Sequence, residues 1–455
     1  MTRAVALFLA LLMTAVPLAG CTGDDTELNA ANERITELES QAEADQAKIA
    51  ELEDEQSDLL ETIGAQTVEL ENLCCTLGEM AIQYQYGYDI GYDDGWYDGY
   101  DGAASSGGSS STLDEIISRG YMKCGVKESQ YGMGYLDWDT GVRSGLDIEY
   151  CKAVAAAIGL DPETDIEYIP ASASDRFLKL ASGTIDVLIR TTTWTTSRDA
   201  DLNADFAGMN FFDGQGILVR EDVFPAADAG NSAGGLDGAN ICVGIGTTTE
   251  GNMVDWFSSR NIAFTSVPVA DAAEATAKFI DGSCDAFTGD MSAMVAKKWQ
   301  LDGDDSMGGV DIWIASELMS KEPLGAATRD MDSDFKDVVA WVWYGMVTAE
   351  EMGVTAANAA ASAAAACDGS DPGMCRLLTE NLGLGTAANP LAGDWMQAVL
   401  ATAGNYGEAY DDAFCDGTYD GVSGSAAMTG CLISRVGTLN ALVSEGGIQY
   451  APAMR

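Results

Sequence analysis

The hexapeptide TWTTSR, at residues 193–198, contains side chains well suited to hold an anion. Arg198 carries a planar guanidinium that can donate two parallel hydrogen bonds to one carboxylate. Thr193 and Thr195 add hydroxyl groups on the same expected loop. The segment therefore predicts a carboxylate-binding site, with an ordinary surface ion pair of the arginine as the alternative.

A second candidate for anion binding lies at residues 244–250, where GIGTTTE opens an expected helix. The backbone N–H groups of Thr247 and Thr248 would point at an anion there, and the helix dipole adds positive potential. Gly246 begins the GTTTE part of the motif. Taken alone, this pattern also fits a simple helix N-cap.

The composition limits the classes of function. The chain has 72 Asp and Glu against 23 Lys and Arg, which gives a formal net charge of -49 at pH 7. Such a balance repels phosphate backbones and anionic lipid surfaces, so it argues against nucleic-acid binding. The chain contains no histidine, which excludes serine–histidine hydrolysis and histidine-ligated zinc. The acidic balance also fits salty or extracellular surroundings.

Residues 1–20 have the features of an export signal. Arg3 precedes an apolar stretch at 4–17 that is short for a membrane span. LAGC, at residues 18–21, matches the lipobox of bacterial lipoproteins, so Cys21 is expected to carry the lipid anchor. Ordinary secretion, with a chance cysteine at this position, is the alternative.

The cysteines indicate an oxidising compartment. With Cys21, Cys74 and Cys75 set aside, eight cysteines remain and no CxxC metal spacing occurs. Local pairing would give four disulfides, although the sequence alone does not determine the connectivity: Cys124 with Cys151, Cys242 with Cys284, Cys367 with Cys375, and Cys415 with Cys431.

Residues 21–83 are expected to form the lipid anchor and a coiled-coil stalk. Apolar residues follow a heptad over residues 28–73, which at about 1.5 Å per residue would span roughly 70 Å. Polar Asp45, Gln56 and Gln66 interrupt the core positions and could set register or a homo-oligomeric state. A single amphipathic helix folded back on the protein is the alternative.

Residues 84–111 separate this stalk from the rest of the chain. They contain GYDIGYDDGWYDGYDG (87–102), in which a glycine recurs every fourth residue, followed by the Gly/Ser-rich run AASSGGSSS (103–111). The second run is typical of a flexible linker. We interpret the repeat as a packing or spacer joint, with glycan contact and cation binding as alternatives.

From residue 112 onward, short β-branched runs alternate with helical stretches. This alternation predicts an α/β fold with mostly parallel sheets. Two such series follow one another, which implies two lobes. The expected strands of the first series lie at 121–126, 164–171 and 184–190, and those of the second at 240–245, 263–269 and 284–290.

The chain resembles the solute-binding proteins of amino-acid ABC importers, in particular the general L-amino-acid-binding branch. The resemblance runs from TLDEIISRGYMKCGV (112–126) almost to the C-terminus and covers about three quarters of the chain. Its specific motifs are DVLIRTTTWTTSRD (186–199), DFAGMNFFDGQGILVR (205–220), GTTTE (246–250), SKEPLGAATR (320–329), AEEMGVTAAN (349–358), NYGEAY (405–410) and GGIQYAP (446–452).

The resemblance implies a two-lobed clamshell, the type II periplasmic-binding-protein fold, which the chain crosses twice. The crossings are expected near residues 211–219 and 320–326. Lobe 1 would then comprise residues 112–215, lobe 2 residues 216–319, and residues 320–455 would return to lobe 1 and add a C-terminal helical region.

The resemblance also implies roles for individual residues. Arg198 would grip the ligand α-carboxylate, with Thr247 and Thr248 of the second lobe on the same group, and Asp290 would receive the ligand ammonium. A lone aspartate at a strand end is otherwise more often an N-cap. Two further contacts are expected: Arg190, with the carboxylate or an acidic side chain, and Met133, where the family often has an aromatic residue that Tyr131 or Tyr135 could replace.

The function implied is that of an extracytoplasmic, lipid-anchored binding protein that delivers L-amino acids to an ABC permease. Broad specificity, no catalysis, no cofactor and no metal are expected. Alternatives are an amino-acid-sensing receptor lipoprotein and a clamshell enzyme such as a dehydratase.

Overall fold

The computed structural model describes residues 111–303, 306–415 and 431–455. The expected signal peptide, Cys21, the coiled coil and the glycine–aromatic repeat lie outside these residues. Within them, no helix combines the length and the hydropathy that a membrane span requires. The expected α/β alternation is confirmed, because strands and helices alternate from residue 112 through the second lobe.

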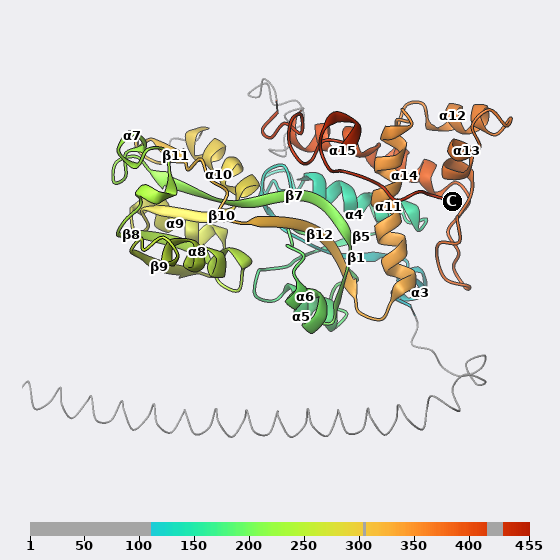
Figure 1. Cartoon of the computed structure of the whole chain (residues 1–455). Coiled ribbons are helices and arrows are strands. Elements are labelled where there is room, and N and C mark those ends of the chain that lie inside the picture. The colour runs from blue at the N-terminus through green and yellow to red at the C-terminus, as the bar shows by residue number, and fades with distance from the viewer. Residues whose placement is uncertain (1–110, 304–305, 416–430) are drawn as a thin grey trace, which may run out of the picture. The chain divides into compact units, whose positions relative to one another are not determined.

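Lobe 1 is built around one end of a long sheet, where the strand order is β5-β1-β6-β12-β7 (Figure 1). Strand β1 pairs in parallel with β5 and β6, while β12 runs antiparallel to β6 and β7. The strands span Met122–Val126 (β1), Ile166–Pro170 (β5), Val187–Leu188 (β6), Ala204–Arg220 (β7) and Lys321–Arg329 (β12). β6 is shorter than the strand expected at 184–190.

Helices cover this sheet and bury large aromatic side chains. Helix α4 has eleven buried residues among its twelve, so it lies inside the lobe rather than on its surface. Around it pack Trp343, Trp395 and Tyr406, each at most 2% exposed. The helices of lobe 1 are α3 (Thr112–Arg119), α4 (Leu146–Ala157), α5 (Arg176–Ala181), α6 (Thr196–Asp201), α11 (Ser333–Glu351), α12 (Ala359–Ala366), α13 (Pro372–Thr379), α14 (Trp395–Ala403) and α15 (Tyr406–Phe414). A small antiparallel sheet joins β2 (Ser129–Gln130), β3 (Gly134–Leu136) and β4 (Arg143–Ser144).

Lobe 2 continues the sheet in the order β7-β10-β8-β9, with β11 on β7. Separate hydrophobic clusters fill it, one around Trp256 and Phe257 and another around Phe279. Its elements are α7 (Ala226–Ala229), β8 (Ala239–Gly244), α8 (Thr248–Ser258), β9 (Phe264–Val269), α9 (Ala272–Asp281), β10 (Ala286–Asp290), α10 (Met291–Gly303) and β11 (Ile312–Ile314).

Strands β7 and β12 run side by side between the lobes (Figure 1). β7 pairs with β12 up to Gly214 and with β10 from Gln215 onward. The two crossing strands approach closely at Gly208 and Gly325, where a Cβ atom on Gly325 would lie 2.4 Å from the carbonyl oxygen of Gly208. Because a side chain at this point would push the strands apart, glycine is required there.

The four expected disulfides are present in the structure: Cys124–Cys151, Cys242–Cys284, Cys367–Cys375 and Cys415–Cys431. The first two lie entirely in the cores of lobe 1 and lobe 2, respectively. Their cysteines are 27 and 42 residues apart in the sequence. By restricting the unfolded chain, each disulfide is expected to stabilise the folded state by about 3–4 kcal/mol.

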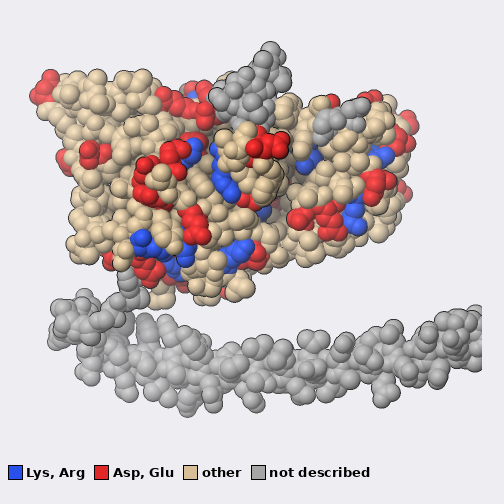
Figure 2. Space-filling model, turned by 180° about the vertical axis from the view of Figure 1, so that it is seen from behind, with Lys and Arg blue, Asp and Glu red and all other residues tan. Residues whose placement is uncertain are grey.

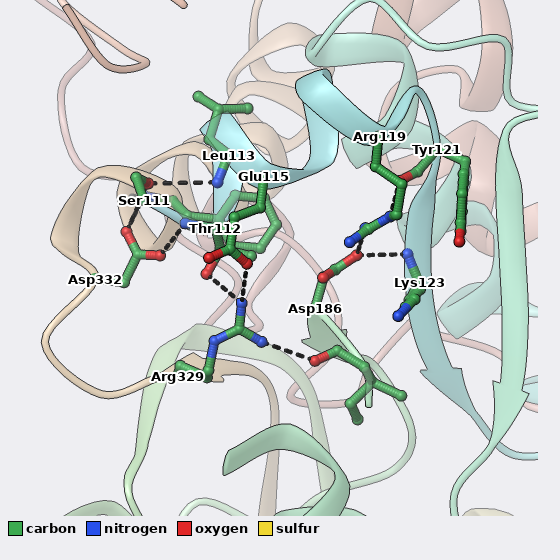
Figure 3. A network of polar contacts seen from close by, with 12 residues as sticks. Ser111, Thr112, Leu113, Glu115, Arg119, Tyr121, Lys123, Asp186, Arg329 and Asp332 are labelled. Carbon is green, nitrogen blue, oxygen red and sulfur yellow. Dashed lines mark hydrogen bonds and ion pairs between the residues drawn. The ribbon is translucent and has the colours of Figure 1, made fainter. Parts of the chain in front are cut away.

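Asp332 joins the start of the folded module to the helix α11. Its carboxylate accepts hydrogen bonds from Ser111 Oγ at 2.8 Å and from the backbone N–H of Thr112 at 2.7 Å (Figure 3). It also caps α11 by accepting from the N–H of Phe335. Nearby, Arg329 donates to Thr112 Oγ1 at 2.8 Å, so α3 is held against the end of β12.

We expect Asp332→Ala to lower the free energy of unfolding by about 2 kcal/mol, because the variant loses an N-cap and two further hydrogen bonds. Urea unfolding of the oxidised protein measures this loss. Asp337→Ala is the control, since it removes the same charge from an exposed site on α11. An equal loss in both variants would contradict the role assigned to Asp332.

Candidate functional site

A cavity of about 450 Å³ is lined by residues of both lobes. Lobe 1 contributes the segments that follow β1, β5 and β6, and lobe 2 those that follow β8, β9 and β10. All six segments come from carboxyl ends of strands, which is where open α/β sheets bind their ligands.

Arg198 lies on this cavity and is only 8% exposed. Thr195, expected as a ligand contact, does not line the cavity. It is the N-cap of α6, and its hydroxyl accepts the N–H of Arg198, which positions that residue on the first turn of the helix. The guanidinium donates from Nη1 to the carbonyl oxygen of Thr193 at 2.9 Å. Among the described residues no carboxylate pairs with it at ion-pair distance, so its other donors are available to a ligand. Burial lowers the pKa of Arg198 from its usual value.

Thr193 of lobe 1 and Thr248 of lobe 2 meet across the cavity, with their hydroxyl oxygens 3.4 Å apart. Both donate to one oxygen of Glu322, at 2.6 and 2.7 Å. The other oxygen accepts from Asn252 at 2.8 Å and from Ser320 at 2.5 Å. Glu322 lies on the crossing strand β12 and is fully buried, so its carboxylate links both lobes at the hinge.

The start of α8 faces the cavity from lobe 2. Thr247 is the N-cap, since its hydroxyl accepts the N–H of Glu250, and Thr247, Thr248 and Thr249 all line the cavity. Gly246 does not line it, and its N–H donates to the Glu250 side chain at 3.0 Å. The helix terminus therefore presents threonines to a ligand, while the glycine supplies the turn before them, at a φ of 68°.

Asp290 ends β10 and lines the same cavity. Burial raises the pKa of its carboxyl to about 6, and the positive charge of Lys127 opposes that shift. The neighbouring Asp213, on β7, accepts the N–H groups of Gly214 and Ser292. Burial and the charge of Asp290 together raise the pKa of Asp213 to about 7. Asp290 is thus the carboxylate placed to receive a cationic group.

Several cations of the cavity were not singled out from the sequence. Besides Arg190 and Arg198, the cavity is lined by Lys127, Arg176 and Lys297. Lys127 donates to Gln130 Oε1 at 2.6 Å, and burial lowers its pKa to about 8. No motif marks these residues, because they become neighbours only where strand ends of different parts of the chain meet.

Met133 does not line the cavity. Its side chain is fully buried in the lobe 1 core, because the loop after β1 turns back against the start of α4. Tyr131 lines the cavity instead. Its ring is tilted by 31° against that of Tyr135, with centroids 4.0 Å apart, and makes an edge contact with Trp299 of lobe 2. Tyr131 therefore contributes the aromatic ring that the sequence predicted near Met133 on the cavity.

The charge of the cavity is opposite to that of the exterior. Figure 2 shows acidic side chains spread over the face it displays, with fewer basic groups among them. The cavity lining has five cations, Lys127, Arg176, Arg190, Arg198 and Lys297, and three carboxylates, Glu128, Asp271 and Asp290. The arrangement can hold a molecule that carries both carboxylate and ammonium groups.

Comparisons with known proteins agree with this chemistry. Residues 122–226 match the bacterial extracellular solute-binding proteins, family 3. The glutamate/glutamine/aspartate/asparagine-binding protein BztA of Rhodobacter capsulatus is 39% identical over 76% of this chain and 94% of its own length. The general L-amino acid-binding periplasmic protein AapJ of Rhizobium johnstonii is 36% identical over 77% of this chain and 95% of its own length.

A solved structure gives the same result for the fold. An ABC transporter periplasmic binding protein from Brucella ovis, with glutathione bound, is 36% identical and superposes with a TM-score of 0.66 over 76% of this chain and 100% of that one. The resemblance drawn from the sequence motifs is therefore confirmed. With its two-lobed α/β fold and its cavity at the strand ends, this chain belongs to the bacterial extracellular solute-binding proteins of family 3.

Proposed function

We propose that this protein captures L-amino acids outside the cytoplasm and delivers them to an ABC permease. The observation that carries the proposal is that one cavity is lined both by the guanidinium of Arg198, which has no ion-pair partner among the described residues, and by the carboxylate of Asp290. An α-amino acid needs a cation with oriented donors for its carboxylate and an anion for its ammonium. The names of BztA and AapJ support the amino-acid class.

Binding would work through closure of the lobes. The ligand carboxylate would bridge Arg198 of lobe 1 and the α8 terminus of lobe 2, so ligand binding favours the closed arrangement. A permease that recognises the closed form would then accept only loaded protein. Binding alone accounts for the roles of these cavity residues, and the relatives named above are binding proteins.

Lipid anchoring belongs to the same proposal and rests on the lipobox at Cys21. Bacterial lipoproteins carry more than one acyl chain, which suffices for stable anchoring where a single chain is marginal. The heptad region would hold the binding module away from the membrane and could join several copies.

The test of the proposal is a thermal-shift panel of the twenty amino acids. A bound amino acid at about 100 times its Kd should stabilise the protein by about 2.7 kcal/mol. We expect Arg198→Ala and Asp290→Ala to weaken binding by at least about 30-fold, because each leaves a charged group of the ligand unpaired. Arg260→Ala, on the lobe 2 surface, is the control. No shift with any amino acid would refute the proposal.

Ligand affinity should depend on pH through Asp290. A ligand ammonium needs the ionised carboxylate, and burial raises the pKa of Asp290 to about 6. Affinity should therefore fall by up to about tenfold per pH unit below that value, as Asp290 takes up a proton. Titration calorimetry between pH 8 and pH 5 measures the effect. Asp290→Asn should bind weakly with no such fall, and a flat profile for the natural protein would count against Asp290 as the ammonium site.

Removing the hinge carboxylate should favour the open form. Glu322→Ala breaks hydrogen bonds to Thr193 and Thr248, so we expect a larger radius of gyration without ligand and at least about tenfold weaker binding. Small-angle scattering and calorimetry measure the two effects. Glu317→Ala is the control, since the Glu317 carboxylate accepts hydrogen bonds from Ser232 and Ala233 of its own lobe. Unchanged scattering in Glu322→Ala would show that Glu322 does not couple the lobes.

A further inference from the structure

Two arginines on the cavity, buried Arg176 and half-buried Arg190, form no ion pair among the described residues. Arg176 is 2% exposed, and the one hydrogen bond that its side chain makes among the described residues runs from Nη1 to the carbonyl oxygen of Ala173 at 2.6 Å. Its Nε is buried without an acceptor, and so is the Nε of Arg190. Buried guanidinium groups are normally paired, because an unpaired charge loses its hydration without compensation.

The carboxylates near these arginines are engaged elsewhere. Asp175 forms an ion pair with Lys179 at 2.8 Å and accepts the N–H of Ser172. Asp147 accepts the N–H of Thr191 at 3.0 Å. Both attract Arg190 electrostatically, but within the part of the chain that the structure describes neither lies at ion-pair distance from it.

The carboxylates of the cavity lining do not neutralise these arginines either. Glu128 forms an ion pair with Arg143, and Asp271 caps α9 by accepting the N–H groups of Ala273 and Glu274. Asp290 remains. Its charge attracts both arginines, but it forms no ion pair with either among the described residues, and it is the group that an amino-acid ammonium would occupy. Among the residues that line the cavity, cations therefore still outnumber carboxylates after an amino acid binds through its two α-groups.

The unpaired arginines are close to the carboxylate site. The guanidinium carbons of Arg176 and Arg198 lie 5.0 and 5.7 Å from the centroid of one ring, that of Phe177. Burial, followed by the positive charges of Arg190 and Arg198, lowers the pKa of Arg176 to about 8. Such mutual repulsion would be relieved by an anion placed among the three guanidinium groups.

We propose that Arg176 and Arg190 form a second anion subsite, so that the preferred ligand carries a carboxylate in addition to that of its α-amino-acid group. This inference rests on the proposed function and narrows its ligand class. The second carboxylate has two chemical sources. It is either the side chain of an acidic amino acid or the terminal carboxylate of a γ-glutamyl dipeptide, for which a cavity of about 450 Å³ is within the usual range of small-molecule sites.

The experiment compares L-glutamate with L-glutamine by titration calorimetry at pH 7.5. The two ligands have nearly the same shape and differ by one charge, so the ratio of their affinities reports the subsite. We expect glutamate to bind at least about tenfold more tightly than glutamine, because a carboxylate forms stronger hydrogen bonds with a buried guanidinium than a neutral amide does. The ratio should fall toward one in Arg176→Gln and Arg190→Gln. It should stay high in Arg260→Gln, which removes a lobe 2 charge outside the cavity.

The outcomes separate this inference from the function on which it rests. Equal binding of glutamate and glutamine by the natural protein, with no tighter binding of γ-glutamylglycine, overturns the second subsite and leaves amino-acid binding intact. No binding of any amino acid overturns the proposed function itself. Because the natural protein supplies the decisive ratio of affinities, a variant that fails to fold does not block the test.

γ-Glutamylglycine is the ligand of the second arm of the experiment. If it binds more tightly than glutamate and loses affinity in Arg176→Gln, the subsite holds and the peptide is the source of the second carboxylate.

Discussion

The carboxylate of Glu322 is the interaction on which the geometry of the site depends. It is fully buried on a crossing strand and accepts four hydrogen bonds, two of them from Thr193 and Thr248 of opposite lobes. A buried carboxylate is costly unless hydrogen bonds satisfy its lone pairs, so the donors are held in place as firmly as the acceptor. The same contacts set the hydroxyl groups beside Arg198. The hinge and the carboxylate site are therefore one polar network.

The opposite charges of the exterior and the cavity also constrain the ligand. The chain carries a formal net charge of -49, yet its cavity is lined by five cations. At physiological ionic strength, surface charges are screened over about 8 Å, whereas charges in a partly buried cavity are screened much less. An anionic ligand that reaches the cleft therefore meets the local field of the arginines rather than the field of the whole protein. The acidic exterior does not prevent binding of anions within.

Part of the site was accessible from sequence because local segments contain it. Arg198 and Thr193 belong to one loop, and Thr247 and Thr248 to one helix start, so short motifs describe them. Met133 shows the limit of this reasoning. Its place in the chain matched a family position, but the turn of the loop after β1 decides which side chain faces the ligand, and that turn places Met133 in the core and Tyr131 on the cavity.

The sequence by itself determined the α/β alternation, the family and the short motifs that carry carboxylate donors. These follow from hydrophobic period, turn residues and local spacing, all of which act within a few residues along the chain. Only the tertiary structure decided that Glu322 joins residues more than 70 positions away and that Arg176 lies unpaired beside Arg198. Burial and electrostatic pairing depend on which strand ends meet in space, and that arrangement leaves no periodic pattern in the sequence.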